Sequence, residues 1–432
     1  MKRTSILMLL AAGCLLCTAC DAADKDKALN ITSDNTPSKP QTVYSDYYSG
    51  SPSLITDFEE LSIDLSGDSG AVSETGDAIC FTDDYMYLCD VIEPEEGKNI
   101  QKTNGIVGVN QAGEKIRICP EPYCSVSDIC NHIAFTNGEK IISHENYLYI
   151  CGTPYLDTGY YPRTCIMQYN LSTKEYIKYA EIPAATSSLF TYSNYLFAAV
   201  PSSDTTIILY CFDLTQNIGY TYTFSSDFSG PKFLGAAYNH LIAADYEKLY
   251  LIDGSGSISK TLELNECIVD FDFYNGTLYF SLDDLCIYQY YYANNTYEQL
   301  ISNGHMFEVY SDTIYYLPYE EVTGLKYKIS HRDDETGQIV YEIVDYPLIN
   351  GNSIYTYSLG TAQTSTFLTA DSERFLSGAL YVSDFGLVYE GYINNETPQQ
   401  SFPSMTVFHD LTSGDETILT TFLLGKLRSF GQ

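Results

Sequence analysis

The sequence predicts an all-β fold built from repeated antiparallel hairpins, and two observations lead to this prediction. First, 41 Tyr and 20 Phe residues suit half-buried pleated strands. Second, a turn followed by a short Tyr- or Leu-centred strand recurs in DDYMYLC (83–89), ENYLYIC (145–151), SNYLFAA (193–199), YNHLIAA (238–244), YNGTLYFS (274–281), YSDTIYYL (310–317) and SDFGLVYE (383–390). Units this small must stack on their neighbours to bury a core. The expected architecture is a β-propeller, most simply of seven four-stranded blades, with eight as the alternative.

The fifth unit gives the clearest view of one blade. IVDFDFYNGTLYFSLDD (268–284) places two alternating strands around Asn275-Gly276, a strong signal for a tight hairpin. LCIYQYYYANNTYEQLI (285–301) follows as a second hairpin. Four antiparallel strands in about 35–45 residues correspond to one propeller blade. Segments 133–182, 187–224 and 233–264 fit the same frame, and in each the outer hairpin is expected to turn at an Asx-type residue, namely Asn170, Asp213 or Asp253.

The sixth unit departs from the regular spacing. Its two halves, 305–319 and 352–369, are separated by LKYKISHRDDETGQIVYEIVDY (325–346), which alternates like a hairpin and is predicted to be an insertion projecting from one face. The first unit carries a second excursion at 91–104. Because open sheet edges are a liability, either 59–66 or 420–430 is expected to supply a strand that closes the ring.

The N-terminus has the pattern of a secretory signal peptide. Lys2 and Arg3 precede an apolar run, 6–16, that is too short to span a bilayer as a mature helix. Thr18-Ala19 before Cys20 resembles a bacterial lipobox, although Cys17 stands where that motif usually has Leu. A lipobox ending at Cys14 is the alternative, with a shorter apolar run. We therefore expect lipidation at Cys20.

These features divide the chain into three expected parts. Residues 1–19 form the signal peptide, 20–57 a lipid-anchored flexible linker rich in Asp, Ser, Thr and Pro, and 58–432 the propeller. No second apolar segment of membrane-spanning length follows, so the lipid is expected to be the only membrane anchor. The predicted location is the extracytoplasmic face of a bacterial cell membrane.

Charge and composition narrow the function classes. The formal net charge of −34 disfavours nucleic acid as a partner and fits a soluble, monomeric surface protein. The absence of Trp excludes the Trp-Asp repeat type of propeller, and no Gly-Gly doublets recur at kelch spacing.

The lipobox, the Asn/Asp-x-Leu/Ile-Tyr hairpins and CPEPYCSVSDIC (119–130) together resemble TolB-like propellers, and most of all the Tyr-rich lipoproteins of unknown function of anaerobic Gram-positive gut bacteria. In that family a Cys-x2-Pro-x-Cys-x-His segment with a third Cys is frequent near the end of the first blade. Cys119, Pro122, Cys124 and Cys130 match, but Val126 stands where His is expected. The resemblance covers most of the chain and brings no established activity.

The cysteines beyond the anchor offer two candidate sites. Cys119, Cys124, Cys130 and His132 could hold a structural zinc, but their spacing is wider than usual, so a disulfide between two of the thiols is favoured over metal. Cys151 and Cys165 flank one loop between consecutive strands and are expected to form a disulfide. No resident metal or cofactor is predicted.

Catalytic motifs are missing from the sequence. The six histidines form no H-E-x-x-H motif, and neither a Gly-x-Ser-x-Gly elbow nor a phosphate-binding Gly-Lys-Ser/Thr loop occurs. Catalytic residues therefore remain unassigned. The predicted function is a binding or scaffolding propeller for an extracellular glycan or protein partner. The alternative is a carbohydrate-active enzyme, a hydrolase or lyase, with carboxylates in the propeller channel.

Overall fold

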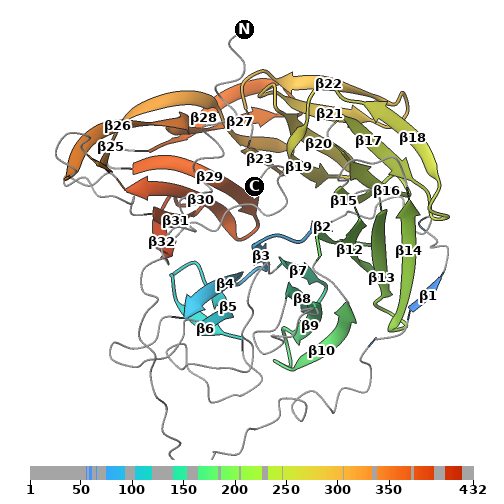
Figure 1. Cartoon of the computed structure of the whole chain (residues 1–432). Coiled ribbons are helices and arrows are strands. Elements are labelled where there is room, and N and C mark those ends of the chain that lie inside the picture. Colours follow the sequence, from blue (N-terminus) through green and yellow to red (C-terminus); the bar gives the residue numbers. More distant parts are fainter. Residues whose placement is uncertain are drawn as a thin grey trace, which may run out of the picture. The chain divides into compact units, whose positions relative to one another are not determined.

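Seven four-stranded antiparallel blades form a ring, which confirms the predicted seven-bladed β-propeller (Figure 1). This computed structural model describes residues 55, 58–60, 65, 74–92, 103–118, 140–152, 164–182, 186–203, 206–225, 232–245, 247–304, 306–332, 338–370, 374–393 and 404–420, all within the unit Ser45–Gln432. The predicted signal peptide, Cys20 and all but Ile55 of the predicted linker lie outside them, as do Cys119, Cys124, Cys130 and His132. Within these ranges no helix is long and apolar enough to cross a membrane.

Each blade takes its four strands, here A to D from the ring centre outward, in chain order. Blades one to three are β3 (Ile79–Phe81), β4 (Met86–Ile92), β5 (Thr103–Val109) and β6 (Lys115–Arg117); β7 (Lys140–His144), β8 (Tyr147–Gly152), β9 (Thr164–Asn170) and β10 (Tyr176–Ile182); and β11 (Ser188–Tyr192), β12 (Tyr195–Ser203), β13 (Thr206–Asp213) and β14 (Ile218–Ser225). Blades four and five are β15 (Lys232–Ala237), β16 (His240–Ala244), β17 (Lys248–Ile252) and β18 (Ile258–Glu263); and β19 (Ile268–Tyr274), β20 (Thr277–Leu282), β21 (Ile287–Tyr291) and β22 (Thr296–Ile301). Blades six and seven are β23 (Met306–Tyr310), β24 (Thr313–Leu317), β27 (Ser353–Ser358) and β28 (Gln363–Thr369); and β29 (Arg374–Ser383), β30 (Gly386–Ile393), β31 (Ser404–His409) and β32 (Glu416–Thr420).

The phrase repeated in the sequence is the turn between strands A and B of every blade. In blade five, Asn275 and Gly276 both have positive φ, 47° and 69°, as a type I′ turn requires. In blade six, Ser311 and Asp312 adopt the same conformation, with φ of 48° and 59°. Because antiparallel strands alternate in direction, the A–B and C–D turns of all blades lie on one face of the ring, called the turn face below.

The predicted Asx turns between strands C and D are confirmed. The Asn170 side-chain oxygen accepts hydrogen bonds from the backbone N–H groups of Ser172 and Thr173, at 2.9 and 2.8 Å. Asp213 and Asp253 bond their own turns in the same way, with oxygen–nitrogen distances of 2.9–3.0 Å. The side chain thus satisfies turn amides that no strand partner reaches.

The core lies between the faces of neighbouring blades. Phe190 stacks on Phe197 of its own blade with ring centroids 4.7 Å apart and reaches Phe233 of blade four at 6.4 Å. Blade seven meets blade one through the same kind of packing, since Phe81 and Phe385 lie 5.8 Å apart. Gln111 also donates a 2.8 Å hydrogen bond to the Phe385 carbonyl oxygen. In the described residues, side-chain packing therefore joins the first and last blades.

Of the expected closing segment 59–66, residues 59, 60 and 65 are described, and they lie at blades three and four and do not close the ring. β1 (Phe58–Glu60) adds to the outer edge of blade three, parallel to β14, because Phe58 packs against Tyr210 at 4.9 Å. The other candidate, 420–430, lies outside the described residues beyond Thr420. The packed chain also begins before the expected boundary at residue 58, since Ile55 is 7% exposed and bridges Ala180 of β10.

The chain reaches the ring centre before it enters blade one. β2 (Glu74–Thr75) pairs antiparallel with β11, and Asp77 bridges Ile141 of β7. The Thr75 hydroxyl donates a 2.9 Å hydrogen bond to the Leu234 carbonyl of blade four. Segment 74–77 therefore covers inner strand edges of blades two to four that would otherwise be open.

The predicted insertion region forms a long two-stranded ribbon. β25 (Tyr319–Arg332) and β26 (Ile339–Asn350) pair antiparallel between strands B and C of blade six (Figure 1). The expected segment 325–346 lies inside this ribbon, which extends further toward the blade at both ends. Leu325, 1% exposed, packs its base against Phe375 of blade seven. Since it connects strands B and C, the ribbon leaves from the face opposite the turn face.

Candidate functional site

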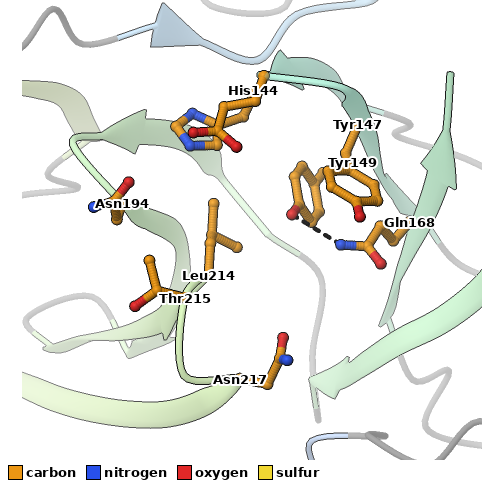
Figure 2. A pocket seen from close by; sticks show the side chains of 9 residues that line it. His144, Tyr147, Tyr149, Gln168, Asn194, Leu214, Thr215 and Asn217 are labelled. Atoms are coloured by element: carbon orange, nitrogen blue, oxygen red, sulfur yellow. Dashed lines mark hydrogen bonds between the residues drawn. The ribbon is translucent and has the colours of Figure 1, made fainter. Parts of the chain in front are cut away.

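A pocket of about 180 Å³ opens between blades two and three on the turn face (Figure 2). Strands β7 to β9 of blade two provide one wall, and the two turns of blade three provide the other. Figure 2 shows Tyr149 and Gln168 on one side of the space, with Asn194 and Thr215 on the other. The lining residues are His144, Glu145, Tyr147, Tyr149, Gln168, Asn194, Leu214, Thr215 and Asn217.

One wall of the pocket carries a hydrogen-bonded pair in which the tyrosine is buried and the glutamine half-buried. Gln168 donates from Nε2 to the Tyr149 hydroxyl oxygen at 2.9 Å (Figure 2). Tyr149 is 2% exposed, and this burial raises the pKa of its phenol to about 12, against the opposing effect of the Gln168 hydrogen bond. The phenol is therefore neutral at physiological pH and keeps a proton to donate. Gln168 likewise keeps its carbonyl oxygen as an acceptor.

The blade three wall is fixed by backbone contacts. Leu214 donates its N–H to the Asn194 carbonyl at 2.9 Å, which ties the C–D turn to the A–B turn. Asp213 accepts from the Thr215 hydroxyl at 2.7 Å and so orients that side chain. Asn217 holds a left-handed backbone with φ of 55° at the end of the turn. The rim is therefore preorganised by the turn itself.

The charge in the pocket is small and negative. Burial lowers the pKa of His144, with Glu145 acting in the opposite direction, so the imidazole is neutral at physiological pH. Glu145 lies exposed at the rim with φ of 50°. Among the described lining residues, none is Lys or Arg. The arrangement can exchange hydrogen bonds with a neutral polar ligand, but it offers no counter-charge to an anion.

A second candidate site is one face of the β25–β26 ribbon. Ile339, Tyr341 and Ile343 are 66%, 53% and 60% exposed. Residues two apart in a strand point to the same side, so these three form one apolar row. Their cross-strand partners are Arg332, Ser330 and Lys328, and the Lys328 ammonium lies 4.4 Å from the centroid of the Tyr341 ring. We call this surface the ribbon row.

Two carboxylates on the innermost strand of blade five, one buried and one half-buried, are used structurally. Asp270, fully buried, accepts hydrogen bonds from the backbone N–H groups of Phe271 at 3.0 Å and Phe307 of blade six at 3.1 Å. Asp272 bonds the N–H groups of Phe273 and Val309 in the same way, at 2.8 and 2.7 Å. These contacts link the inner edges of two blades. Neither carboxylate is therefore our choice for a catalytic role.

The predicted Cys151–Cys165 disulfide is wrong in this structure, where both residues are buried thiols. Cys151 pairs with Ile166, whereas Cys165 pairs with Gly152. This offset of one residue sends the two side chains to opposite faces of the blade. Cys151 faces the core shared with blade three, and Cys165 faces the core shared with blade one.

The predicted cluster of Cys119, Cys124, Cys130 and His132 lies outside the described residues. Among the residues that are described, no group of three or more His, Cys, Asp or Glu side chains is arranged to hold a metal ion. The pocket itself was missed from sequence. A signal was present in the alignment of the repeats, because His144 ends its strand where Tyr192, Tyr274 and Tyr310 end theirs.

The chain is only distantly similar to proteins of known structure. No family model and no curated protein matches it. The β-propeller domain of the Trilobed protease from Pyrococcus furiosus is similar over 81% of this chain and 98% of its own, with 11% identity and a TM-score of 0.46. Pyrococcus horikoshii acylaminoacyl peptidase is similar over 83% of this chain and 54% of its own, with 12% identity and a TM-score of 0.46. The computationally designed Ika8 protein is similar over 78% and 97%, with 11% identity and a TM-score of 0.38. Likenesses at this level assign no activity and no partner.

Proposed function

We propose that this chain is a lipid-anchored binding propeller on the extracytoplasmic face of the cell membrane, and that it holds an extracellular protein partner through the ribbon row. The observation that supports this proposal is the exposure of Ile339, Tyr341 and Ile343 on an element that no blade requires. Contiguous exposed apolar side chains are typical of interaction surfaces. Loops added to a regular scaffold carry function more often than the scaffold does.

The charge around the row favours a partner of particular chemistry. Lys328 and Arg332, the cross-strand partners of Ile343 and Ile339, place positive charge beside the apolar row. A partner that presents acidic groups around an apolar strip would match both features. Lys328 lies over the Tyr341 ring, so an acidic group that contacts this lysine would also lie beside the apolar row.

The test is binding to an array of extracellular proteins, peptides and glycans, with turnover measured on the same panel. The double variant Tyr341→Ser/Ile343→Ser removes two members of the row. We expect at least a tenfold loss of binding to acidic protein or peptide probes. Ile258→Ser/Ile418→Ser is the matched control, because those residues are 45% and 56% exposed on β18 and β32, away from the ribbon.

Three results would contradict the proposal. Equal loss in both double variants would assign binding to general surface hydrophobicity. Turnover of a glycan would favour the alternative of a carbohydrate-active enzyme. Self-association that the ribbon variant abolishes, measured by light scattering, would identify a second copy as the occupant.

A further inference from the structure

One contact recurs between neighbouring blades on the turn face. The last residue of strand A is a tyrosine whose hydroxyl bonds the A–B turn of the next blade. Three junctions carry this contact: Tyr192 donates to Asn239 Oδ1 at 3.4 Å, Tyr274 accepts from the Asp312 N–H at 3.0 Å, and Tyr310 donates to Asp384 Oδ1 at 2.7 Å. We call it the tyrosine clamp. It occupies the space between adjacent turns.

The junction between blades two and three has a histidine in this place. β7 ends at His144, and the next A–B turn carries Asn194. An imidazole is shorter than a phenol and has no terminal hydroxyl to reach across. Both His144 and Asn194 line the pocket, so the cavity lies at the place that the clamp occupies at three of the other junctions.

A second residue that is smaller than tyrosine borders the same space. In blade five the first residue of the C–D turn is Tyr292, whose ring stacks on Tyr238 of blade four with centroids 4.8 Å apart. Blade three has Leu214 at the corresponding position, directly after β13. His144 and Leu214 thus leave a preformed cavity between blades two and three, whereas the stacked pair of Tyr292 and Tyr238 fills the corresponding space beside the C–D turn between blades four and five.

The volume and walls of the pocket define a ligand class. A cavity of roughly 150 Å³ holds one six-membered ring, and this one measures about 180 Å³. Unlike an apolar cavity, it offers amides from Gln168, Asn194 and Asn217 and hydroxyls from both blades. The Tyr147 ring adds an apolar surface for the C–H face of a ligand.

We propose that this pocket binds a single neutral pyranose ring, as a free sugar or as the end of an extracellular glycan. Sugar hydroxyls both donate and accept, which matches the Tyr149 proton, the Gln168 carbonyl oxygen and the Glu145 carboxylate. The absence of Lys and Arg from the described lining disfavours phosphates and acidic sugars. The pocket opens on the turn face and the ribbon leaves from the opposite face, so this inference does not depend on the proposed partner of the ribbon.

The test restores the missing clamp. His144→Tyr should fill the cavity and bond Asn194, as Tyr192 bonds Asn239 one blade later. The probes are methyl glycosides of glucose, galactose, mannose and N-acetylglucosamine, together with glucuronate and inorganic phosphate, measured by ligand-observed NMR and calorimetry on the full-length protein. We expect at least one neutral glycoside to bind the natural protein and to bind His144→Tyr at least tenfold more weakly.

Two further variants make the result specific. Leu214→Tyr, which copies the arrangement of Tyr292, should also abolish binding and guards against misfolding of the first variant. Tyr310→His opens the clamp at a different junction and should leave sugar binding unchanged. Failure of every neutral glycoside to bind, binding of glucuronate or phosphate alone, or equal binding by the natural protein and a folded His144→Tyr would each overturn the proposal.

Discussion

Gly219 of β14, whose side chain is a single hydrogen atom, leaves room for a segment that is distant in sequence. A Cβ atom at this residue would lie 2.7 Å from Ile55 Cγ2 and 2.7 Å from Phe58 Cδ1. No side chain fits at that distance, so the glycine lets Ile55 and Phe58 lie flat on the outer edge of blades two and three. The pairing of Phe58 with Gly219 places the aromatic ring directly over this gap.

Replacement of this glycine should therefore destabilise the protein. We expect Gly219→Ala to lower the free energy of unfolding by about 1–3 kcal/mol, the usual cost of overpacking. Urea denaturation measures the change. Gly360→Ala is the matched control, because a Cβ there meets nothing within 4 Å, and its effect should stay within about 0.5 kcal/mol. Equal effects of the two substitutions would refute the steric explanation.

At the same scale, residue type predicted some contacts and not others. Asn170, Asp213 and Asp253 were correctly predicted as turn residues, because an Asx side chain bonds its own backbone and needs no distant partner. The pairing of Cys151 with Cys165 was wrong, because it depends on register. A shift of one residue along β9 moves a cysteine side chain to the other face of the blade. The hydrophobic pattern of the sequence does not reveal such a shift.

Among the elements, the segment before blade one has a role that the sequence did not predict. Ile55, Phe58–Glu60 and Leu65 form what we call the outer strap, in which Ile55 and Phe58 pack between blades two and three and Leu65 packs between blades three and four. Backbone hydrogen bonds tie Ile55 to Tyr179 at 3.0 Å and to Glu181 at 3.3 Å. The strap thus protects the open outer edges of two blades.

Loss of the strap should expose those edges selectively. In the double variant Ile55→Ser/Phe58→Ser we expect amide hydrogens of β10 and β14 to exchange at least tenfold faster, because their local opening no longer breaks strap contacts. Hydrogen exchange with mass spectrometry resolves the strands. Blade five, which the strap does not touch, is the internal control. Uniform acceleration across all blades would mean that the strap acts on global stability instead.

The elements also show which parts of the fold could be predicted from the sequence. The A–B hairpins were found from their turn residues, and 325–346 was recognised as an alternating hairpin outside the regular spacing. The ribbon nevertheless begins at Tyr319 and ends at Asn350, further than the alternation suggested. Register irregularities near Val322 interrupt the two-residue period at its base, so the pattern was lost there.

Across the whole molecule, buried tyrosine phenols predict sensitivity to alkali. Burial raises the pKa of Tyr149 and of Tyr279 to about 12. Phenols of the unfolded chain titrate near ~10. Between these values the unfolded state loses protons that the folded state keeps, so the stability present below pH 10 declines as the pH rises toward 12.

We therefore expect the urea midpoint to be steady from pH 8 to 9 and to fall steeply above pH 10. Tyrosinate absorbance should rise together with the loss of near-ultraviolet circular dichroism. Full titration of the phenols near pH 10 in a protein that keeps its native dichroism would contradict the burial of these groups. Added salt serves as a control for repulsion among surface carboxylates, which it screens.

The sequence by itself determined the all-β class, the repeated unit, the turns and the irregular sixth blade, because these follow from local propensity and from periods of a few residues. Tertiary structure decided how blade one meets blade seven, where the outer strap lies and which thiols share a face, because these depend on contacts between distant segments. The pocket depends on both the sequence and the tertiary structure. His144 could be read in the aligned repeats, but only the packing of blades two and three shows that its smaller ring leaves a cavity.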